Sequence, residues 1–102
     1  MKLLTLIIHE AATQDLIDTL LCHDRVDGFT TSAGHGHSCR TCRNPFETSE
    51  DLVTGRVPRV RFDLLLEDDA VDPVLEALRG CESCVSGLGV FWVTPVERGG
   101  GL

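Results

Sequence analysis

The chain of 102 residues carries 16 acidic and 9 basic residues, which gives it a formal charge of −7. A chain of this length forms one domain with one modest core. Because binding to nucleic acid depends on neutralising phosphates, the acidic balance argues against DNA or RNA as a partner. We therefore expect a single domain over residues 1–102 and no nucleic-acid partner.

An apolar run opens the chain at residues 2–8 and is followed at once by His9 and Glu10. A secretory signal needs an apolar region of about 7–15 residues followed by a small-residue cleavage site, and a membrane-spanning helix needs about 20 apolar residues. We predict instead a central buried strand, a cytoplasmic protein and no insertion into the membrane. In the cytoplasm, paired cysteines more often bind metals or act in redox chemistry than form structural disulfides.

The next two predicted elements are a helix and a strand. Thr13 is a candidate N-cap for the helix, and a short turn at His23 and Asp24 ends it. The apolar positions at helical spacing are Leu16, Ile17, Leu20 and Leu21. A strand is predicted over residues 26–32, because Phe29, Thr30 and Thr31 favour extended backbone.

The second half of the chain is predicted to contain a strand, a helix and a final strand. Residues 57–66 alternate as a half-buried strand does. One face would carry Val60, Phe62, Leu64 and Leu66, and the other Arg59, Arg61, Asp63 and Leu65. Asp72 before Pro73 predicts a helix start, and Gly80 predicts its end. The last predicted strand covers residues 90–96 and carries Phe91 and Trp92.

The order strand, helix, strand, strand, helix, strand predicts an α+β, ferredoxin-like βαββαβ fold, an antiparallel sheet with two helices on one face. Since successive elements alternate in direction, three connections should share one end of the domain: the first strand-helix junction, the long stretch after the second strand and the second helix-strand junction. The first strand is apolar on both faces. We therefore expect the uncovered sheet face to meet a partner subunit.

Two histidines and a Cys-x-x-Cys pair lie within eight residues of one another, in a stretch that includes two glycines. The ligands would be His35, His37, Cys39 and Cys42. Thiolate and imidazole suit a transition metal ion such as Zn²⁺ or Cu(I). A loop with incidental thiols is the alternative.

A second Cys-x-x-Cys pair, Cys81 and Cys84, follows the end of the second predicted helix. Metal ligation and a local disulfide both remain open for this pair. If both pairs converge, they form a four-thiolate site; if they do not, each pair is a candidate thiol-disulfide switch. A redox enzyme is less favoured, because neither pair has the strand-to-helix setting typical of such enzymes.

Several arginines gather in or beside the long stretch between the second and third strands, although the chain is acidic overall. A solvated strand face explains them without a ligand. The alternative is a site for a nucleotide phosphate or bicarbonate, because guanidinium groups match such oxyanions. The residues of this alternative site are Arg56, Arg59, Gly87, Gly89 and Arg98. No nucleophile, base and orienting acid stand at a recognisable spacing, so we expect a protein that is not an enzyme.

Five short motifs and a terminal Gly-Leu, spread over nearly the whole chain, resemble the PII-like small proteins. The five motifs are Gly28-Phe29-Thr30-Thr31, Gly34-His35-Gly36, Glu50-Asp51-Leu52-Val53-Thr54-Gly55-Arg56, Val60-Arg61-Phe62 and Trp92-Val93-Thr94-Pro95-Val96. They are most similar to an uncharacterised branch whose genes accompany heavy-metal efflux pumps.

This resemblance implies a homotrimer, an effector loop at residues 33–56, a flexible tail at residues 97–102 and a ligand cleft between neighbouring subunits. PII signalling proteins bind adenine nucleotides through lysine and arginine, whereas the only lysine here is Lys2. We therefore expect a sensor that binds a metal through its Cys/His loop and regulates a metal-efflux pump or another membrane transporter. The alternative effector is an adenine nucleotide or a small anion.

Overall fold

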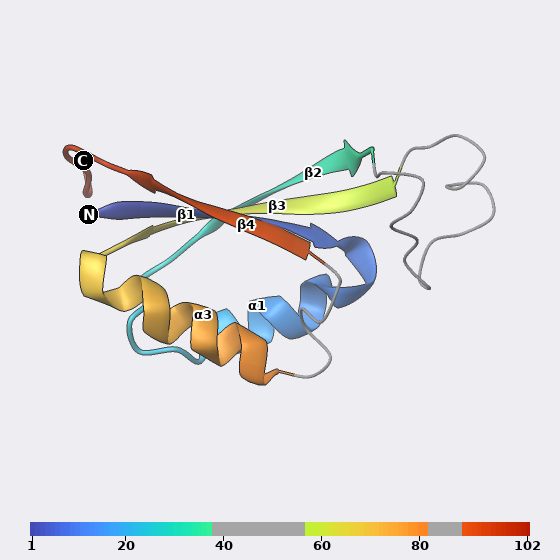
Figure 1. The fold of residues 1–102 in the computed structure, drawn as a ribbon, viewed down its shortest axis with the longest axis horizontal. Coiled ribbons are helices and arrows are strands. Elements are labelled where there is room, and N and C mark those ends of the chain that lie inside the picture. The colour runs from blue at the N-terminus through green and yellow to red at the C-terminus, as the bar shows by residue number, and fades with distance from the viewer. Residues whose placement is uncertain (38–56, 82–88) are drawn as a thin grey trace.

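The computed structural model describes residues 1–37, 57–81 and 89–102, which form one antiparallel sheet and two helices (Figure 1). Short 3₁₀ turns, η1 and η2, precede the helices α1 and α3. The elements are β1 (Lys2–His9), η1 (Glu10–Ala12), α1 (Thr13–Leu21), β2 (Thr30–Gly36), β3 (Val57–Leu66), η2 (Asp68–Ala70), α3 (Val71–Gly80) and β4 (Gly89–Pro95).

The strand order is β2-β3-β1-β4, with every neighbouring pair antiparallel. Both helices cover the same face of the sheet, and the other face is bare within one chain (Figure 1). The predicted α+β, ferredoxin-like arrangement is therefore confirmed. Within the described ranges, no helix is long and apolar enough to cross a membrane.

The core forms where the helix-facing side chains of β1 and β3 meet α1 and α3. Leu4, Leu6 and Ile8 alternate along β1 toward the helices and are at most 3% exposed. In β3, Phe62 and Leu64 lie directly across from Leu6 and Leu4 and are fully buried. This alternation, at the two-residue period of a strand, confirms the predicted faces of residues 57–66.

Helix α1 begins differently from the prediction. Thr13 is its first helical residue and not its N-cap, because the chain has already turned through η1. The turn η1 is capped by His9, whose Nδ1 accepts a hydrogen bond from the Ala11 amide at 3.0 Å, whereas the N-cap of α1, Ala12, makes no side-chain hydrogen bond. At the other end Leu21 is 70% exposed, so the buried stripe of this short helix is carried by Leu16 and Leu20.

Helix α3 also starts earlier than its sequence signals predict. It begins at Val71, directly after η2, so Asp72 and Pro73 lie inside the first turn. Proline is tolerated there, because the first amides of a helix have no intrahelical acceptor. Gly80 is the last helical residue, as predicted, and Cys81 follows as the C-cap.

Strand β2 is shifted by four residues relative to the predicted span of 26–32. It covers Thr30–Gly36, pairs along its whole length with β3 and leaves nearly all of its side chains exposed. An edge strand of this kind is held by backbone hydrogen bonds, so its side chains show no alternating pattern that a sequence could reveal. Residues 33–36, which the prediction assigned to the effector loop, therefore belong to the sheet, and residues 38–56 lie outside the described residues.

Candidate functional site

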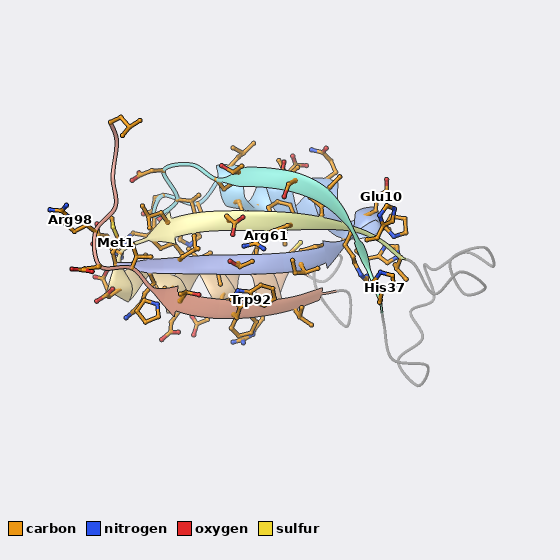
Figure 2. All side chains as sticks on the ribbon, turned by 90° about the horizontal axis from the view of Figure 1, so that it is seen from above. Met1, Glu10, His37, Arg61, Trp92 and Arg98 are labelled. Atoms are coloured by element: carbon orange, nitrogen blue, oxygen red, sulfur yellow. The ribbon has the colours of Figure 1, made fainter. Side chains whose placement is uncertain are left out.

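One end of the sheet collects most of the described residues that the sequence singled out (Figure 2). Strand β1 ends there at His9 and β2 at Gly36, while β4 begins there at Gly89, paired with Ile8. Figure 2 shows Glu10 and His37 at this end, with Met1 and Arg98 at the other. The predicted gathering of the three connections at one end is therefore confirmed for the residues that flank them.

The two candidate histidine ligands differ in their setting. His35 lies in β2 opposite Pro58, and His37 follows the strand directly; both are exposed. Cys39 and Cys42 lie outside the described residues. Within residues 1–37, 57–81 and 89–102, no group of three or more His, Cys, Asp or Glu side chains is close enough to hold a metal ion. A site that uses His35 and His37 would therefore need ligands from elsewhere in the chain.

Cys81 caps the end of α3, packs against the core and is disulfide-bonded. Metal ligation and a local disulfide both stay predictions for the second Cys-x-x-Cys pair. Cys84 lies outside the described residues. Cys22 is an exposed free thiol just past the end of α1.

Arg59 lies at the same end, paired with His9 on one side and with Gly34 on the other. Its side chain crosses Gly36 so closely that a Cβ there would lie 2.8 Å from Arg59 Cγ. The glycine therefore lets the arginine side chain lie across β2.

The alternative anion site cannot assemble within one chain from its described members. Gly89 shares the end of the sheet where Arg59 lies, but Arg98 lies at the opposite end (Figure 2). Arg56 and Gly87 are outside the described residues. A site that uses both Arg59 and Arg98 would need two copies of the chain.

The bare face of the sheet carries apolar side chains around a polar centre. Leu3 is paired with Leu65, and Thr5 with Trp92, so these residues share this face. Leu65 is 36% and Trp92 44% exposed, whereas Thr5 is fully buried. The bare face therefore combines exposed apolar side chains with a buried threonine.

The polar centre of this bare face is a hydrogen-bonded group that sequence reasoning missed. Asp63 accepts from Thr5 Oγ1 at 2.9 Å and from Arg61 Nε and Nη2 at 2.9 and 3.2 Å. The hydrogen bonds from Arg61 are the main cause that holds the pKa of Asp63 below its ordinary value. The sequence signal that could have revealed this hydrogen-bonded group is Thr5, a polar residue inside the otherwise apolar run of β1.

Substituting Asp63 with asparagine should destabilise the protein more at neutral pH than in acid. A carboxylate whose folded pKa is lowered stabilises the folded state above its ordinary pKa of about 3.9, and this contribution is lost as the pH falls through the lower folded pKa. Urea unfolding at pH 7 and pH 3 should show a difference between Asp63→Asn and wild type that shrinks in acid. The exposed Asp27 gives the control Asp27→Asn; an equal response of both variants would contradict the prediction.

The comparisons with known proteins place the chain in a family but give no activity. No curated protein matches it. A crystal structure of a DUF3240 family protein from Shewanella baltica OS155 is similar, with a TM-score of 0.74 and 22% identity over 99% of this chain and 94% of that one. At that identity the likeness shows the fold alone, and one fold hosts many functions. The resemblance to PII-like proteins stays a prediction. A family profile described as "Protein of unknown function (DUF3240)" matches residues 1–102, and the chain belongs to that family.

Proposed function

We propose that this protein is a non-enzymatic, PII-like sensor that assembles as a homotrimer, binds a transition metal ion and regulates a metal-efflux or other membrane transporter. The metal would be held by Cys39 and Cys42 together with His35 and His37, and after reduction also by Cys81 and Cys84. Binding would order the stretch between β2 and β3, which then contacts the transporter.

The observation that carries the proposal is that three of the candidate ligands, His35, His37 and Cys81, lie toward one end of the sheet. His37 leaves β2 there, and Cys81 ends α3 at the same end (Figure 1). His37 and Cys81 flank the two stretches that carry the remaining cysteines, so both stretches leave the body of the domain toward the same end of the sheet. Imidazole and thiolate at such positions suit Zn²⁺ and Cu(I) better than they suit hard cations.

The bare sheet face supports assembly. Leu3, Ile7, Leu65 and Trp92 offer apolar surface beside the hydrogen-bonded Asp63. An antiparallel sheet with helices on one side needs solvent or a partner on the other, and an apolar patch favours a partner.

The proposal predicts that reduced protein takes up Zn²⁺ or Cu(I) in a fixed ratio to the chain and that Cys39→Ser/Cys42→Ser abolishes this uptake. Thiolates are the strongest ligands in the set, and hydroxyls replace them poorly. Native mass spectrometry of the reduced protein, titrated with each metal, measures uptake and assembly together. Cys22→Ser is the matched control, because it removes an exposed free thiol outside the proposed ligand set.

Three outcomes separate the alternatives. Uptake that survives in Cys39→Ser/Cys42→Ser would overturn the metal proposal. A trimer that ignores both metals and retains an adenine nucleotide would make the nucleotide or anion the effector. Arg59 and Arg98 would then have to come from different subunits, because they lie at opposite ends of one chain (Figure 2).

A thiol switch is the third possibility, favoured by the disulfide at Cys81. It predicts no metal uptake by the reduced protein and a change in assembly or ligand binding on oxidation. Repeating the titration on oxidised protein, in which Cys81 supplies no thiolate, distinguishes a redox switch from a metal sensor.

A further inference from the structure

A cavity of about 190 Å³ lies on the helix side of the sheet, between α3 and β4. This cavity is on the opposite face of the sheet from the bare apolar surface. The described residues that line it are Leu6, Ile8, Leu75, Leu78, Arg79, Gly89, Val90 and Phe91.

The cavity floor is apolar and buried, whereas its rim is exposed. Leu6 and Ile8 of β1 and Leu78 of α3 are at most 3% exposed and belong to the hydrophobic core. Phe91, on the edge strand β4, is 45% exposed and forms part of the rim. A ligand could therefore enter past β4 without disturbing the packing of the core.

Arg79 is the charged residue among those that line the cavity. Its guanidinium carbon lies 5.7 Å from the centre of the Phe91 ring, within the range of a cation–π contact. Arg25 and Arg61 each pair with an aspartate, but among the described residues Arg79 has no such ion pair. In a chain with 16 acidic residues, a guanidinium held on an aromatic ring beside an apolar cavity is available to an anion from outside.

We propose that this cavity binds a small amphipathic carboxylate, with its apolar part against Leu6, Ile8 and Leu78 and its carboxylate on Arg79. A cavity of about 150 Å³ lined by apolar side chains holds benzene, so the slightly larger volume here fits a chain of about six carbons. Ligand pockets of this kind combine an apolar lining with few polar groups that fix orientation. Arginine suits the carboxylate because its fork of N–H donors matches two oxygens.

A titration with hexanoate tests the proposal. Its binding is measured by NMR chemical-shift changes of methyl-labelled leucine and isoleucine side chains. We expect saturable shifts at Ile8, Leu75 and Leu78. Affinity should rise about fourfold for each methylene from butanoate to hexanoate, because each added group buries apolar surface. Arg79→Gln should weaken hexanoate at least fivefold and leave hexan-1-ol unchanged, since only the carboxylate needs the charge.

Arg25→Gln is the matched control, because it removes the same charge at an exposed position that pairs with Asp69 and does not line the cavity. Arg79→Lys should retain part of the preference for hexanoate over hexan-1-ol. The proposal is overturned if acetate shifts these methyl groups as strongly as hexanoate does. It is also overturned if the shifts fall on Leu3 and Leu65 of the bare face, or if Arg79→Gln and Arg25→Gln bind hexanoate equally.

Discussion

Replacing Phe62 with alanine should lower the free energy of unfolding by about 3–5 kcal/mol, the usual loss for a buried aromatic residue. Phe62 is fully buried in β3, directly across from Leu6, and its ring centre lies 5.8 Å from that of Phe29. The cavity left behind would lie between the sheet and the helices, where neighbouring side chains cannot close it without moving the strands. For a domain of about 100 residues this is a large share of a total stability of about 5–15 kcal/mol.

Phe91→Ala is the matched control. Phe91 lies on β4, across from Leu6 of β1, and shares the helix-facing side of the sheet, but it is 45% exposed. Its truncation should cost less than half as much as that of Phe62. Urea unfolding monitored by circular dichroism, at one fixed protein concentration, measures both losses. Equal losses for the two variants would contradict the placement of the core.

Replacing Trp92 with glutamate should dissociate the assembly that we propose. Trp92 lies on the bare face of the sheet, paired with Thr5, and is 44% exposed in the single chain. An unpaired charge buried at an interface commonly costs about 3–5 kcal/mol, which corresponds to a dissociation constant raised by about two to four powers of ten. Since the residue is half exposed in the monomer, the fold itself should tolerate the change.

Analytical ultracentrifugation over a range of protein concentrations measures this effect. Phe91→Glu is the control. It introduces the same charge at the residue before Trp92 in β4, which lies on the helix-facing side of the sheet. We expect wild type and Phe91→Glu to remain associated at concentrations where Trp92→Glu is monomeric. A monomeric wild type, or equal dissociation of both variants, would refute association through the bare face.

The candidate site was only partly predictable. Residue types and spacing identified His35, His37 and the cysteine pairs, and alternating strand directions placed their flanks at one end of the sheet. The Thr5-Asp63-Arg61 group and the cavity beside Arg79 were missed. Both depend on which strands are neighbours, and a single sequence does not record the contacts of residues far apart in the chain.

The sequence by itself determined the two central strands, the two helices and hence the ferredoxin-like order, because buried faces require apolar residues at the period of the element. Only the tertiary structure decided the span of β2 and the starts of α1 and α3. Strand β2 is an edge strand held by backbone bonds to β3, and each helix is preceded by a 3₁₀ turn. Backbone pairing and turns of this kind involve groups common to every residue, so side-chain patterns carry little information about them.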